Sequence, residues 1–145
     1  MENLADIAIE RELSALCSRA DADFAALAGL RKSERQAKWE YLWGSRSLRT
    51  RQMTVASGIG LAGMAIRHGS VCRIDSLSGL MKPADCPVML AEHLKAAAAF
   101  ALVATGGLNP EGILFIGRRT DKAFSDDEIT AVAQLVAGIK KLYLL

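Results

Sequence analysis

The chain has 145 residues, and 18 Lys and Arg against 16 Asp and Glu give it a formal charge of +2. This length suits a single domain spanning residues 1–145, and the small charge excludes the strongly basic surface of a nucleic-acid or membrane-surface protein. The sequence has no run of about 20 apolar residues and no export signal, so we expect a cytoplasmic protein. Cys17, Cys72 and Cys86 form no C-x-x-C pair, which argues against a disulfide framework or a zinc site.

The first predicted element is an N-terminal packing helix within residues 1–20, where apolar side chains recur at steps of three and four. Residues 23–30 and 37–43 read as two antiparallel strands joined by a polar turn at 31–35. Alternation in the second strand predicts that its aromatic side chains share one face. These side chains are Trp39, Tyr41 and Trp43.

The middle of the chain is built from short elements. A short polar helix over 47–53 leads into a glycine turn over 57–60, and a helix is predicted over 61–68, followed by an edge strand over 71–74. After a loop over 76–84, Pro87 takes the place that proline prefers, at the start of a second short helix. The middle segment therefore contains two helix N-termini, each with backbone N–H groups that lack intrahelical partners.

The last third of the chain predicts a hairpin and a long helix. Apolar runs at 97–104 and 111–119 are typical of central strands. Ser125 and Glu128 form a capping box that opens a C-terminal helix over 125–145. The order of elements favours an α+β domain with an antiparallel sheet. We expect the terminal helices on one face and a small-ligand cavity under the short helices on the other.

The spacing of Gly58, Gly60 and Gly63 matches the dinucleotide fingerprint G-x-G-x-x-G. The approach over 51–57 is too short and polar for a buried parallel strand, and no acidic residue follows at the spacing of a ribose ligand. We therefore interpret the glycines as a tight turn before a helix start, a place that attracts anions.

These motifs together resemble a GAF domain. The resemblance rests on Gly-Ile-Gly-Leu-Ala-Gly entering a helix, on the late strand that begins at Glu111-Gly-Ile-Leu, and on Phe124-Ser-Asp-Asp-Glu opening the last helix. It covers nearly the whole chain. GAF domains host many ligands, so the fold alone does not name the ligand.

A closer resemblance is to the NreA nitrate receptors, and it rests on Lys38-Trp39-Glu40-Tyr41, Gly60-Leu61-Ala62-Gly63 and Pro87-Val88-Met89-Leu90-Ala91-Glu92. The resemblance implies a nitrate ion held by backbone amides and a tryptophan. The amides would be those of Leu61 and Ala62 and that of Val88 after Pro87. The side chain would be that of Trp39.

Nitrate also suits such a site physically. A planar, singly charged and weakly hydrated ion costs less to desolvate than phosphate, so helix starts at Leu61 and Val88 could bind it without an arginine. Trp39 and Met89 would help to exclude water, and the Trp39 indole can donate a hydrogen bond. A purely structural role for these residues is the alternative. His68 and His93 are too far apart for a short metal motif, so we expect no metal, no cofactor and no catalytic residue.

The resemblance implies a role in signal transduction: a sensor domain of a two-component system that regulates a sensor histidine kinase. The apolar stripe of the last helix could pack on the first helix or form a homodimer seam, and the sequence does not choose between them. Two alternatives stay open. One is a free methionine sulfoxide reductase with Cys86 as nucleophile, although Ala62 and Gln52 stand where that family would have cysteines. The other is a GAF module that binds an organic ligand or serves as a dimerisation scaffold.

Overall fold

The structure, a computed structural model, describes residues 4–30, 36–56, 58–75, 85–104 and 106–144. The expected turn over 31–35, the expected loop over 76–84 and Ser57 of the glycine turn lie outside the described residues. The helices and strands follow one another as α1 (Leu4–Ala20), β1 (Phe24–Gly29), β2 (Gln36–Lys38), β3 (Tyr41–Trp43), the 3-10 helix η1 (Thr50–Gln52), β4 (Thr54–Ala56), α2 (Gly60–His68), β5 (Val71–Asp75), α3 (Pro87–Glu92), β6 (Ala96–Val103), β7 (Pro110–Arg118) and α4 (Asp126–Tyr143).

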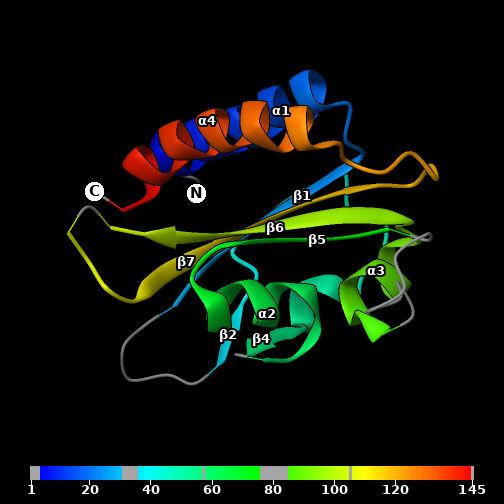
Figure 1. Ribbon diagram of the computed structural model, residues 1–145, viewed down its shortest axis with the longest axis horizontal. Coiled ribbons are helices and arrows are strands. Elements are labelled where there is room, and N and C mark those ends of the chain that lie inside the picture. The colour runs from blue at the N-terminus through cyan, green and yellow to red at the C-terminus, as the bar shows by residue number, and fades with distance from the viewer. Residues whose placement is uncertain (1–3, 31–35, 57, 76–84, 105, 145) are drawn as a thin grey trace.

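The elements form three layers (Figure 1). The middle layer is a five-stranded antiparallel sheet in the order β3-β1-β7-β6-β5. The terminal helices α1 and α4 cover one face, whereas α2, α3 and the two-stranded sheet of β2 and β4 lie over the other. The predicted α+β fold is confirmed, as are the edge position of β5 and the inner positions of β6 and β7.

The sheet separates two hydrophobic cores. Successive residues of a strand point to opposite faces, so Ala98 and Phe100 of β6 pack with the terminal helices while Ala97 and Ala99 pack with the short helices. These side chains are almost fully buried. This burial on both faces explains why β6 reads as a continuous apolar run.

The start of α4 confirms the predicted capping box. Ser125 Oγ accepts from the Glu128 backbone N–H at 3.1 Å, and Glu128 Oε1 accepts from the Ser125 N–H at 3.1 Å. Glu128 also pairs with Arg118, a buried arginine at the end of β7 that stacks on the Phe124 ring. The sequence did not predict this pair, which ties the last helix to the last strand.

The single strand predicted over 37–43 is wrong, because the chain changes partner in its middle. Residues 36–38 pair with β4, whereas β3 pairs with β1, and the Glu40 N–H donates to Leu27 O at 2.9 Å at the start of that pairing. The three aromatic side chains consequently do not share a face. Trp39 is buried in the core under the short helices, while Tyr41 packs against the core under α1 and α4.

The short helix predicted over 47–53 is also wrong in extent. Only Thr50–Gln52 form a 3-10 turn. The preceding residues are held instead by hydrogen bonds to the buried carboxylate of Glu92, which the Ser45 and Thr50 hydroxyls and the Arg46 backbone N–H all donate to. Within the segment the Arg49 N–H donates to Ser47 Oγ at 3.2 Å, and a local side-chain bond of this kind competes with helix formation.

Candidate functional site

A small cavity lies on the side of the sheet that carries the short helices. Its volume is about 40 Å³, and since one water needs about 10–15 Å³, it has room for an ion of a few atoms. It is bounded by the glycine turn and α2, by the start of α3, by β4, and by the core of the sheet. The lining residues are Trp39, Met53, Thr54, Val55, Ile59, Gly60, Leu61, Ala62, Cys86, Pro87, Val88 and Phe115.

The start of α2 forms one wall of this cavity. Gly60 has a positive φ of 68°, which favours glycine and lets the chain turn directly into the helix. The first bond to the residue four back is from Gly63 N–H to Ile59 O at 3.2 Å, so the N–H groups of Leu61 and Ala62 precede it. Ile59 provides no side-chain cap. The N–H groups of Leu61 and Ala62 can therefore still donate hydrogen bonds to a bound acceptor.

The glycine spacing has a steric cause. A Cβ at Gly63 would lie 2.2 Å from Ala56 O, so the first turn of α2 approaches the end of β4 too closely for any side chain. The fingerprint-like spacing therefore serves helix packing. The sequence argues against a dinucleotide fold. The observed sheet is antiparallel, which agrees with that prediction because a dinucleotide fold needs parallel strands.

The start of α3 lies next to that of α2. A Cβ added at Gly60 would lie 3.6 Å from Pro87 Cδ and 3.8 Å from Cys86 Sγ. Pro87 occupies the first helical position, as predicted, and the Val88 N–H precedes the bond from Leu90 N–H to Cys86 O. The structure thus brings together five of the six residues expected at the site, which are Trp39, Leu61, Ala62, Pro87 and Val88.

Met89 does not line the cavity. Its side chain is almost fully buried in the same hydrophobic core as most of the lining residues. The position of Met89 therefore does not indicate direct contact with a ligand. It packs the core that supports the wall.

Trp39 is the most informative residue of the cavity. Its side chain is buried, and its ring meets Phe115 of β7 edge to face with centroids 6.0 Å apart. The indole Nε1 is buried and has no hydrogen-bond partner among the described residues. Because an unpaired buried donor costs roughly 1–3 kcal/mol, such a group in a cavity wall indicates a ligand or water that accepts its hydrogen bond.

The lining of the cavity carries no charged side chain among the described residues. Its polar capacity comes from backbone N–H groups, the indole N–H, one threonine hydroxyl and the thiol of Cys86. Helix N-termini favour negative charge, but an ion of high charge would lose too much hydration in such apolar surroundings. The arrangement fits a small, singly charged acceptor.

The three cysteines lie in different surroundings and form no disulfide. Cys17 lies on the buried side of α1, and its burial, with a smaller contribution from the charge of Asp23, raises its pKa to about 12. Burial also raises the pKa of Cys72 on β5. Cys86 is buried at the N-cap of α3 and lines the cavity. Of the three, only Cys86 is placed to meet a ligand there.

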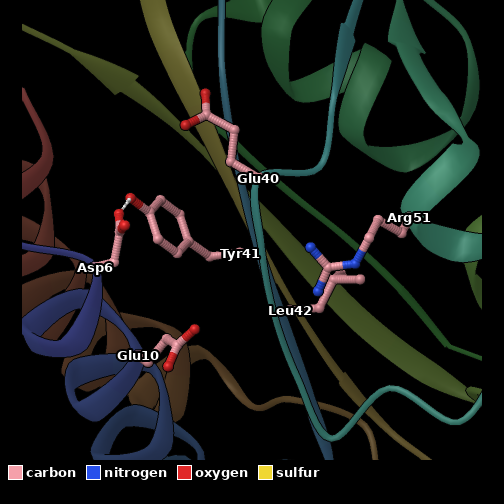
Figure 2. A pocket seen from close by; sticks show the side chains of 6 residues that line it. All are labelled: Asp6, Glu10, Glu40, Tyr41, Leu42 and Arg51. Atoms are coloured by element: carbon pink, nitrogen blue, oxygen red, sulfur yellow. Dashed lines mark hydrogen bonds between the residues drawn. The ribbon is translucent and has the colours of Figure 1, made fainter. Parts of the chain in front are cut away.

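A larger hollow of about 340 Å³ lies between α1, β3 and η1 (Figure 2). It is lined by acidic groups and one arginine, but two of its carboxylates are already engaged. Asp6 accepts from the Tyr41 hydroxyl, and Glu40 accepts from the Tyr143 hydroxyl at 2.7 Å. Burial and the bond to Asp6 raise the pKa of Tyr41 to about 12. These contacts fasten the terminal helices to β3 and do not make a second candidate site.

Sequence reasoning missed the most buried acidic side chain, Glu92 at the end of α3. It accepts from Ser45, Arg46 and Thr50, and it pairs with Arg119. A glutamate at the end of a six-residue helix gives no local signal of burial, because its partners lie more than 25 residues away in the sequence.

No family model matches the sequence, and no curated protein matches it. Among solved structures, a Staphylococcus aureus NreA protein mutated in its nitrate-binding site is 27% identical, with a TM-score of 0.69 over 87% of this chain and 98% of that chain. The GAF domain region of a putative membrane protein from Geobacter sulfurreducens is 17% identical, with a TM-score of 0.77 over 96% and 92% of the two chains.

A third similar structure is a type II free methionine-R-sulfoxide reductase from Thermoplasma acidophilum, 17% identical with a TM-score of 0.72 over 95% and 91% of the two chains. Likenesses at 17% identity speak for the fold alone. None of the described helices has the length and apolar character that crossing a membrane requires. By its layers, its strand order and these likenesses, the chain is a GAF-type domain that resembles NreA.

Proposed function

We propose that the cavity binds nitrate or a similar small anion and that the domain is a sensor without enzymatic activity. The observation that carries this proposal is that Trp39 lines the cavity and that its buried indole N–H has no partner among the described residues. The likeness to an NreA protein named for its nitrate-binding site supports the choice of ion.

The proposed ion is held by N–H donors from three segments. The amides of Leu61 and Ala62 and that of Val88 precede the first helical hydrogen bonds of α2 and α3, and Trp39 adds its side chain. Nitrate has three oxygens in one plane, each of which can accept hydrogen bonds. Its single charge is spread over those oxygens, which keeps the cost of desolvation low in an uncharged lining.

The proposed output is regulation of a sensor histidine kinase in a cytoplasmic two-component system. Nitrate would order the helix starts around Leu61 and Val88, and the kinase would distinguish the ordered form from the empty one. Linkage requires that nitrate bind with different affinity to the free and kinase-bound forms.

A homodimer through α1 and α4 belongs to the same proposal, and sedimentation of the purified protein with and without nitrate tests it.

Isothermal calorimetry of the purified protein with nitrate tests the ligand, with nitrite, chloride and sulfate at matched ionic strength as controls. We expect heat of binding with one site for nitrate and none for sulfate, whose double charge the lining cannot compensate. Equal binding of sulfate would contradict the proposal. An organic molecule that co-purifies in the cavity, found by native mass spectrometry, would favour an organic-ligand module instead.

Reduction of free methionine sulfoxide is the second candidate, because Cys86 lines the cavity. Two observations count against it. A cavity of about 40 Å³ is small for an amino acid, since pockets for organic ligands usually measure roughly 300–1,000 Å³. Cys17, moreover, belongs to the core on the opposite side of the sheet from Cys86 and so cannot resolve an oxidised thiol there, and Cys72 packs against the Cys86 core without lining the cavity.

A further inference from the structure

The carboxylate of Glu92 is fully buried, with 0% of the residue exposed. Oε2 accepts from Thr50 Oγ1 at 2.5 Å and from Ser45 Oγ at 2.6 Å, and Oε1 accepts from the Arg46 backbone N–H at 2.8 Å. Burial raises the pKa of Glu92, but these hydrogen bonds outweigh it and leave the pKa below its ordinary value. The group is therefore an anion at neutral pH, and its bonds are of the strong, charge-assisted kind.

Arg119 adds the balancing charge. Its Nη2 donates to Glu92 Oε1 at 3.0 Å and to Gly44 O at 2.9 Å, and its Nε donates to Glu92 O at 2.9 Å. The arginine follows directly after β7, so the cluster is fastened to the central strand of the sheet. One wholly buried carboxylate thus connects α3, the segment 44–50 and the rigid sheet.

The two elements that this carboxylate joins each continue into a wall of the cavity. Glu92 lies four residues after Val88, and residues four apart share one side of a helix. On the other side, Thr50 opens η1, which runs directly into the lining residues Met53–Val55. The hydrogen bond from Thr50 to Glu92 therefore ties the elements that carry these two walls to each other.

We propose that Glu92 is a positioning residue of the cavity: through Ser45, Arg46 and Thr50 it holds α3 against the segment that leads into β4, and so sets the separation of the two walls. It does not touch the ligand. The consequence for nitrate affinity rests on the proposed function, whereas the consequence for the geometry of the empty cavity does not.

The thiol of Cys86 provides a test that needs no ligand. It lines the cavity and is only 2% exposed, so alkylation requires the walls to separate. Cys17 is equally buried in the core on the far side of the sheet and reports opening of the whole domain. The ratio of iodoacetamide labelling at Cys86 to that at Cys17, read by peptide mass spectrometry, therefore measures local opening of the cavity.

The decisive variant is Thr50→Val, which keeps the shape of the side chain and removes its hydrogen bond to Glu92. We expect the labelling ratio to rise about tenfold, the factor that corresponds to loss of one hydrogen bond to a charged group. Ser45→Ala should raise it in the same direction and serves if Thr50→Val does not fold. Glu92→Gln can still accept from Arg46, but it loses the charge that pairs with Arg119 and so weakens every bond of the cluster, and it should raise the ratio as well.

Ser125→Ala is the matched control, because it removes a cap from α4 on the other face of the sheet. It should raise labelling of both cysteines together and leave the ratio unchanged. An unchanged labelling ratio in Thr50→Val overturns the proposal. So does a rise of the ratio in Ser125→Ala that is as large as the rise in Thr50→Val.

Calorimetry of the same variants with nitrate then separates the two proposals. Weaker nitrate binding in Thr50→Val than in Ser125→Ala supports both. Absence of nitrate binding to the wild-type protein, together with a raised labelling ratio in Thr50→Val, refutes the proposed ligand and supports the positioning role of Glu92.

Discussion

Trp39 and Phe115 meet edge to face, with ring centroids 6.0 Å apart and ring planes inclined by 65°. Phe115 lies in the central strand β7, and its ring also meets that of Phe24 edge to face with centroids 6.0 Å apart. The indole thereby packs against the central strand of the sheet. The donor left without a partner is consequently held in place before any ligand arrives, which lowers the entropic cost of binding.

Replacing Phe115 should weaken this support. Phe115→Leu removes two edge-to-face contacts and part of the buried volume, and we expect it to lower the free energy of unfolding by about 1–2 kcal/mol. Urea denaturation followed by circular dichroism measures the change. A variant as stable as the wild type would show that the aromatic contacts do not hold the indole.

Gly63 of α2 and Gly138 of α4 should respond in opposite ways to alanine. Gly63→Ala places a Cβ 2.2 Å from Ala56 O and should destabilise the domain by about 1–3 kcal/mol. Gly138→Ala on α4 meets nothing within 4 Å and should stabilise it by about 0.5–1 kcal/mol. Thermal unfolding of both variants tests this, and a tolerated Gly63→Ala would refute the steric reason for the glycine spacing.

Acid should weaken the start of α4. The hydrogen bond from Arg118 to Glu128, with the N-cap bonds of Ser125, lowers the pKa of Glu128 from 4.5 to about 2. Because the folded-state pKa is depressed, the contribution to stability is present above pH 4.5 and is lost as the pH falls from 4.5 towards 2.

Glu128→Gln, which cannot ionise, removes this dependence. The difference in free energy of unfolding between wild type and Glu128→Gln should be largest near pH 7 and shrink below pH 4.5. Asp127→Asn, at the neighbouring position without a bond to Arg118, provides the control. A difference that stays constant from pH 7 to pH 3 would show that the ion pair contributes nothing.

Cys86→Ser separates the sensor from the reductase. The substitution keeps a small side chain at the N-cap of α3, so nitrate affinity should change by less than about threefold, or 0.7 kcal/mol. Turnover of free methionine sulfoxide, assayed with a thiol reductant, should be absent from both wild type and variant. If the wild type turns over the substrate and Cys86→Ser does not, the thiol is a nucleophile and the proposal of a non-enzymatic sensor is contradicted.

The sequence was sufficient for the architecture because its signals are local. The capping box at Ser125, the proline at Pro87 and the apolar runs of β6 and β7 each specify an element through neighbours within a few residues. The short connection between β6 and β7 favours their antiparallel pairing, whereas the pairing of β1 with β7 joins segments far apart in the sequence. The residues expected to bind the ligand also come together around one cavity, with the exception of Met89.

The sequence-based predictions failed where the structure depends on contacts between residues far apart in the sequence. Alternation from Trp39 to Trp43 suggested one continuous strand, but pairing with two different partners turns the chain over between Trp39 and Tyr41. The cluster around Glu92 was invisible because Arg119 and Thr50 approach it only in the folded chain. Tertiary context of this kind overrides the pattern of a short segment.

The most direct test of the central claim compares nitrate affinity in Trp39→Phe and Trp43→Phe by calorimetry. Both variants remove one indole N–H, but Trp43 lies on β3 with 37% of its surface exposed and does not line the cavity. We expect Trp39→Phe to bind nitrate about tenfold more weakly, as loss of a hydrogen bond to a charged acceptor implies, and Trp43→Phe to match the wild type. Equal affinities in the two variants would contradict the assignment of Trp39 as the ligand's donor.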